Sequence, residues 1–118
     1  MEAMLSAYMV AALWSSNDES DERGGEPMDN NYGIEDIAPE TVEKMRADVV
    51  KFLAENAADI GDREEQAGHD LWMTRNGHGV GFWETPDWPQ EAGERLTRAA
   101  KAMGETSLYV GDDGMIYA

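Results

Sequence analysis

The sequence predicts an α+β protein in which a small antiparallel β-sheet packs against about three helices, in the order α-α-β-β-α-β-β. Apolar residues recur at helical spacing in three segments, near residues 3–14, 39–60 and 90–103. Two tight-turn signals, Asn76-Gly77 and Asp113-Gly114, each lie between β-prone runs. The 118 residues suffice for a single domain, 1–118, with one modest core.

The first segment, 3–14, is expected to form a helix that is buried along one face. Met4, Leu5, Tyr8 and Leu13 belong to an apolar stripe at helical spacing. The run is too short to span a bilayer, and it lacks the basic region of a signal peptide. We therefore expect a docked helix of a cytoplasmic protein rather than a targeting segment.

Residues 16–37 are expected to form a long acidic loop. Gly24-Gly25 and Pro27 interrupt regular structure there, and Arg23 is its only basic residue. Loops of this length are usually functional or disordered, so two interpretations stay open: a solvated surface segment, or a contact surface for a basic partner. The acidic residues of this loop are Asp18, Glu19, Asp21, Glu22, Glu26, Asp29, Glu35 and Asp36.

The second helix is expected to begin at Pro39, because proline is favoured at the first helical position, and its regular part to end at Gly61. Residues 62–67 would add a turn or two before the next element. The expected inner stripe consists of Val42, Met45, Val49, Phe52, Leu53 and Ile60.

The central stretch 69–83 is expected to form a β-hairpin about Asn76-Gly77, since a type I′ turn needs positive φ at both central residues. Alternation would place Leu71, Met73, Val80 and Phe82 on a core face. Trp72 and Trp83 would share the opposite face with Asp70 and Thr74. Together with Trp88, these two tryptophans form a candidate aromatic surface that is rimmed by Arg75 and Asp70. Two readings of that face stay open: a protein-binding surface, or a satellite core.

The C-terminal part is expected to contain a helix followed by a second hairpin. Residues 85–89 break the preceding strand and start the helix, and Gly104 ends it. The strands would be residues 108–110 and 115–117, joined through Asp113-Gly114. The inner face of the helix would carry Ala92, Leu96, Ala99, Ala100 and Met103.

Composition excludes several classes of function. The formal net charge is −16, from 25 acidic and 9 basic residues, so nucleic acid and anionic membranes would be repelled. A natural macromolecular partner would be basic, or the charge would serve solubility alone. The absence of cysteine excludes disulfides, thiolate metal sites and thiol nucleophiles.

The polar residues near the hairpin are candidates for a catalytic site. Cross-strand pairing would place His69 opposite Glu84 with Asp70 beside them, which suits a metal or an acid–base pair. Capping of the strand entry by His69 and Asp70 is favoured over that arrangement. We therefore expect no catalytic residues, metal or cofactor, and keep a small metal-dependent hydrolase using His69, Asp70 and Glu84 as the enzymatic alternative.

Four sequence blocks carry a resemblance: Tyr8 with residues 12–15, residues 34–41, the stretch 68–83, and residues 109–114. In these blocks the chain resembles a group of small acidic proteins encoded by bacteriophages and prophages. The resemblance implies a setting in the cytoplasm of a bacterial host rather than a mechanism. Small acidic phage proteins often act on host machinery, including restriction and CRISPR defence.

The expected function is therefore that of a non-enzymatic phage accessory protein that binds and inhibits a basic, nucleic-acid-handling host protein. The narrower expectation is a counter-defence DNA mimic, of anti-CRISPR or anti-restriction type. A structural phage protein that is acidic only for solubility is a further alternative. The expected partner-binding residues are Asp18, Glu19, Asp21, Glu22, Glu26, Glu35, Asp36, Trp72, Arg75 and Trp83.

Overall fold

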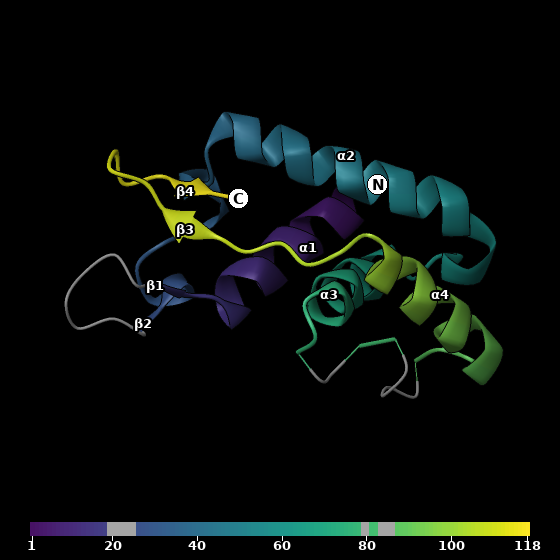
Figure 1. The fold of residues 1–118 in the computed structure, drawn as a ribbon. Helices are drawn as coiled ribbons and strands as arrows, with labels where there is room; N and C mark the ends of the chain where they lie inside the picture. The colour runs from purple at the N-terminus through teal and green to yellow at the C-terminus, as the bar shows by residue number, and fades with distance from the viewer. Residues whose placement is uncertain (19–25, 79–80, 83–86) are drawn as a thin grey trace.

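The computed structural model describes residues 1–18, 26–78, 81–82 and 87–118, and these form an elongated molecule of 44 × 25 × 21 Å (Figure 1). Four α-helices make up most of it, and short strand pairs gather at one end. The elements are α1 (Glu2–Ser15), β1 (Asn17–Asp18), β2 (Glu26–Pro27), the 3₁₀ turns η1 (Met28–Asn30) and η2 (Ile34–Asp36), α2 (Pro39–Ile60), α3 (Glu64–Arg75), α4 (Gln90–Ala102), β3 (Tyr109–Val110) and β4 (Ile116–Tyr117).

Helix α3 is the centre of the packing, and α1 makes the most extensive contact with it. The two backbones meet at Gly68, where a Cβ atom would lie 2.1 Å from the carbonyl oxygen of Met4. Glycine is therefore required at this crossing. Most of α3 is buried, including Leu71, Trp72 and Thr74, because α1, α2 and α4 all pack against it.

The hydrophobic core lies between the four helices. Phe52 of α2 stacks on Phe82 with ring centroids 5.7 Å apart, and Phe82 meets Trp88 edge-on at 5.3 Å. Helix α2 bends at Asn56, which has non-helical φ and ψ of −128° and 19°. In the described ranges, no helix has the length and apolarity needed to cross a membrane.

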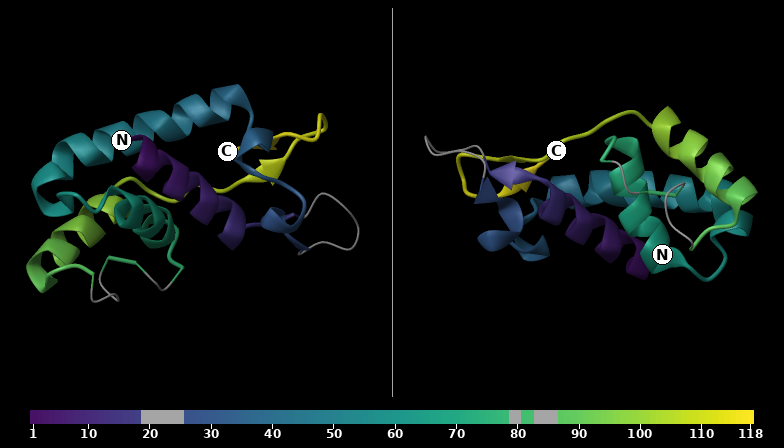
Figure 2. Two further views of the ribbon diagram at one scale, coloured as in Figure 1. Left: turned by 180° about the vertical axis from the view of Figure 1, so that it is seen from behind. Right: turned by 90° about the horizontal axis from the view of Figure 1, so that it is seen from below.

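The strands form two separate antiparallel pairs, β1–β2 and β3–β4. A parallel bridge joins Ile37 to Ile116, and the amide of Ala38 donates to the carbonyl of Ile116 at 2.9 Å. The start of α2 is thereby fastened to the C-terminal hairpin. Both strand pairs lie at the same end of the molecule in every view (Figure 2).

Three expected helices and the C-terminal hairpin are confirmed. Pro39 is the first residue of α2, and Gly61 and Gly104 follow α2 and α4 with φ of 59° and 78°. The second hairpin turns through Gly114, with Val110 paired to Ile116. The segment 16–37, expected to be a loop, contains β1, β2 and two 3₁₀ turns, with residues 19–25 outside the described residues.

The central hairpin is wrong for residues 69–75, which are helical in α3. Asn76 and Gly77 end a helix instead of joining two strands. The amide of Gly77 donates to the carbonyl of Thr74 at 3.2 Å, and that of His78 to Met73 at 3.0 Å. These two bonds make a Schellman motif, in which Gly77 has φ of 68°. Of the expected second strand, Gly79, Val80 and Trp83 lie outside the described residues.

We predict that Gly68→Ala destabilises the protein, although alanine is the better helix former. At an exposed helical site the exchange would stabilise by about 1 kcal/mol. Here the added methyl group collides with the backbone of α1, so urea unfolding should show a loss of about 2–3 kcal/mol.

Gly77→Ala is the comparison for that variant, because a Cβ there meets open space but φ is 68°. Its cost should be only about 1 kcal/mol, from the left-handed conformation. Equal stability of Gly68→Ala and the wild type would contradict the close helix crossing.

Candidate functional site

The aromatic face expected around Trp72 is part of the core. Trp72 is 2% exposed, and its indole N–H donates to the hydroxyl of Ser15 at 2.7 Å. Its ring meets that of Tyr8 edge-on, with centroids 5.4 Å apart. Trp72 is therefore packed in the core instead of lying on an exposed surface. Trp83 lies outside the described residues.

Arg75 is also buried, at 7% exposed, and therefore does not lie at an exposed rim as expected. Its guanidinium donates to the hydroxyl of Tyr8 at 3.0 Å and to the carboxylate of Asp48 at 2.9 Å. Two further bonds reach the carbonyls of Met103 at 3.1 Å and Gly104 at 2.8 Å. Arg75 thus joins α3 to α1, to α2 and to the end of α4.

Asp70 forms a second buried polar cluster in α3. The carboxylate is 0% exposed and accepts hydrogen bonds from the indole N–H of Trp88 at 2.7 Å and from the amide of Gln66 at 3.0 Å. Nδ1 of His69 lies 3.1 Å from Oδ1 of the same carboxylate. Because three donors converge on an acceptor-only group, the buried Asp70 is satisfied without a Lys or Arg partner.

The strand register that brought His69, Asp70 and Glu84 together does not exist, because His69 and Asp70 are neighbours in a helix. Glu84 lies outside the described residues. Among the residues that are described, no three His, Asp or Glu side chains are grouped closely enough to hold a metal ion. His69 remains a half-exposed imidazole that a buried carboxylate orients.

Exposed carboxylates gather at the end of the molecule that carries the strand pairs. We call this surface the acidic end. Its described members are the half-buried Asp36 and six exposed residues, Glu26, Asp29, Glu35, Glu40, Asp112 and Asp113. Asp112 and Asp113 are distant in sequence, but the Ile37–Ile116 bridge brings their hairpin beside η2 and α2. Neither residue is among those expected from the sequence to bind a partner. Asp36 also accepts from the amide of Gly33 at 2.9 Å.

Few basic residues accompany the acidic end. In the sequence, Arg23 is the only Lys or Arg before Lys44, and none follows Lys101. The ammonium of Lys44 lies 3.2 Å from the carbonyl oxygen of Ala118. The hydroxyl of Tyr117 donates to Asp113 at 2.6 Å and holds the pKa of that carboxyl below its ordinary value. Asp113 therefore stays ionised well into mildly acidic solution.

The remaining expected acidic contacts fall in or beside the segment 19–25. Asp18 belongs to β1, where it pairs with Glu26 of β2. Glu19, Asp21 and Glu22 lie outside the described residues. Comparisons with models of protein families, with curated proteins and with solved structures found no match to this chain.

We predict that the protein loses stability between pH 10 and pH 12 through Tyr8. Burial raises the pKa of Tyr8 to about 12, although Arg75 beside it acts in the opposite direction. In this interval the unfolded chain ionises Tyr8 and the folded chain does not, so rising pH favours unfolding, by at most about 2–3 kcal/mol. Urea unfolding at pH 8 and at about pH 11 measures the loss.

Tyr8→Phe is the control for this pH effect. The variant should be less stable at pH 8, because it loses the bond from Arg75, but its further loss at alkaline pH should be smaller than in the wild type. The pKa of Tyr117 is also raised to about 12, but Tyr117 is present in both proteins. Its contribution therefore cancels when the alkaline losses of the two proteins are compared. Identical alkaline losses would show that Tyr8 does not titrate as a buried group.

We also predict that the purified protein contains well below about one equivalent of zinc, since a tight zinc site needs three or four ligands. The chain supplies no cysteine and only two histidines. Elemental analysis after dialysis measures the metal content. A stoichiometric metal that disappears in His69→Ala would instead support the hydrolase alternative.

Proposed function

We propose that this chain is a non-enzymatic phage accessory protein that binds a basic, nucleic-acid-handling protein of the bacterial host through its acidic end and inhibits it. The observation that carries the proposal is that β2, η1, η2, the start of α2 and the β3–β4 turn lie at one end of the molecule (Figure 1), and that each of them contributes carboxylates to the acidic end. The two carboxylates of the β3–β4 turn enlarge the surface expected from residues 18–40 alone.

The charge of the helical half is better neutralised than that of the acidic end. Arg46 pairs with Glu2 at 2.6 Å, Arg95 with Asp59 at 2.6 Å, and Arg75 with Asp48 at 2.9 Å. Within the described ranges, no such arginine pair involves a carboxylate of the acidic end. The negative potential of the protein is therefore strongest where the strand pairs lie.

Carboxylates held on a folded surface can occupy the arginine and lysine side chains that otherwise grip phosphate groups. A protein that binds in this way excludes nucleic acid from its partner, and inhibition follows from binding alone. Counter-defence activity against CRISPR or restriction complexes, with the acidic end acting as a DNA mimic, is the narrower form of the proposal.

The test is retention of host proteins on the immobilised full chain. Proteins retained from a bacterial lysate should be basic, and a short DNA duplex should displace them. Retention should fall steeply with salt, because ionic screening acts over roughly 8 Å at physiological ionic strength. The triple variant that removes exposed carboxylates from the acidic end should retain several-fold less; it combines Glu26→Gln, Glu35→Gln and Asp112→Asn.

A matched triple variant in the helical half controls for net charge, because it removes the same number of exposed carboxylates. It combines Glu55→Gln, Glu91→Gln and Glu94→Gln. We expect it to retain host proteins as the wild type does. Equal losses in both variants would mean that only net charge matters, and retention that DNA does not displace would exclude mimicry.

A further inference from the structure

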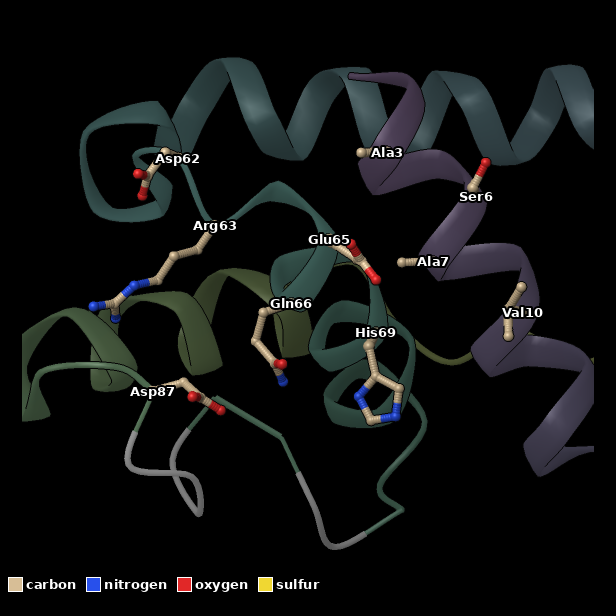
Figure 3. A pocket seen from close by; sticks show the side chains of 10 residues that line it. All are labelled: Ala3, Ser6, Ala7, Val10, Asp62, Arg63, Glu65, Gln66, His69 and Asp87. Carbon is tan, nitrogen blue, oxygen red and sulfur yellow. The ribbon is translucent and has the colours of Figure 1, made fainter.

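A groove of about 840 Å³ is lined by the N-terminal half of α1, by the start of α3 and by Asp87 (Figure 3). Its α1 wall consists of short side chains, the apolar Ala3, Ala7 and Val10 together with Ser6, and Val10 is 56% exposed. Trp14 lies one turn beyond Val10 on α1 and is 58% exposed, with its ring centroid 6.3 Å from that of His69. The groove therefore continues into an exposed apolar surface.

The imidazole of His69 has a fixed orientation at this groove. Asp70 is fully buried beneath it, and its carboxylate can only accept a hydrogen bond from Nδ1–H of His69. In the neutral imidazole, Nε2 is then left with a lone pair. In this form His69 offers a hydrogen-bond acceptor to whatever occupies the groove.

Most other polar groups that line the groove are acceptors too. The NH₂ of Gln66 is engaged with Asp70, which leaves the carbonyl oxygen of Gln66 as an acceptor. Asp62, Glu65 and Asp87 add carboxylates. Figure 3 shows Glu65 pointing toward Ala7 across the groove. An occupant must therefore bring hydrogen-bond donors and positive charge.

Arg63, the arginine that lines the groove, is engaged with Trp88. The guanidinium carbon of Arg63 lies 5.8 Å from the centre of the Trp88 ring, a cation–π distance. In Figure 3 the side chain of Arg63 extends away from Glu65 and His69. The part of the groove beside α1 thus has acceptors and an apolar wall but no basic side chain from Arg63.

We propose that this groove docks an apolar segment of a partner protein through an arginine side chain. A guanidinium has five N–H donors and no acceptor, which complements the lining; it also stacks on aromatic rings such as Trp14. The apolar residues that flank this arginine in the partner would cover Val10 and the apolar wall of the groove. This site shares no residue with the acidic end, so its test does not depend on the proposed function of that surface.

The probe is the synthetic peptide N-acetyl-Leu-Arg-Leu-amide, added to the isotope-labelled full chain and followed by backbone amide chemical shifts. Shifts should saturate and concentrate at Ala7, Gln66 and His69. The same peptide with citrulline in place of arginine has the same shape without the charge. It should bind about tenfold more weakly, as expected when a charged hydrogen-bond donor is lost.

Single variants distinguish docking from general attraction to an acidic protein. Glu65→Gln should weaken arginine-peptide binding several-fold, whereas Glu35→Gln at the acidic end removes the same charge and should not. Val10→Ser should also weaken it, whereas Val50→Ser, at a 45% exposed helical position of α2, should not.

Three outcomes would overturn the proposal: shifts confined to the acidic end, equal binding of the citrulline peptide, or equal effects of Glu65→Gln and Glu35→Gln. None of these bears on the retention of basic host proteins by the acidic end. Conversely, failure of that retention leaves arginine-peptide binding in the groove measurable on its own.

Discussion

The rest of the structure depends on the close crossing of α1 and α3 at Gly68. With no side chain there, the carbonyl of Met4 comes so near that even a methyl group would collide with it. Burial of Trp72 against Ser15 and Tyr8 follows from this approach, since both partners are on α1.

Because α3 is buried on most sides, its polar side chains must find partners inside the protein. Asp70 and Arg75 solve this in different ways. Asp70 collects neutral or imidazole donors, whereas Arg75 distributes its donors over Tyr8, Asp48 and two carbonyls. Asp70 and Arg75 are thereby used for stability, whereas Nε2 of His69 is left for an occupant of the groove.

The sequence predicts α1, α2, α4 and the C-terminal hairpin because each has an exposed face, and a stripe or a turn marks the boundary with water. Helix α3 lacks a clear contrast between a buried and an exposed face, so its apolar residues do not recur at helical spacing. The signal Asn76-Gly77 was ambiguous, since a type I′ turn and a helix C-terminus both require positive φ at glycine. Acids in the first turn, Glu64 and Glu65, and Arg75 in the last turn favoured the helix.

The same limits apply to the candidate sites. Residues 18–40 are contiguous, so their acidity is visible in the sequence, but the contribution of Asp112 depends on the Ile37–Ile116 bridge and could not be inferred. The clustering of carboxylates at the acidic end argues against the alternative in which the charge serves solubility alone. Solubility depends on net charge and is served best by spreading it, because crowded carboxylates repel one another. Gathering them at one end adds that cost without adding solubility, and a basic partner that neutralises the acidic end would relieve it.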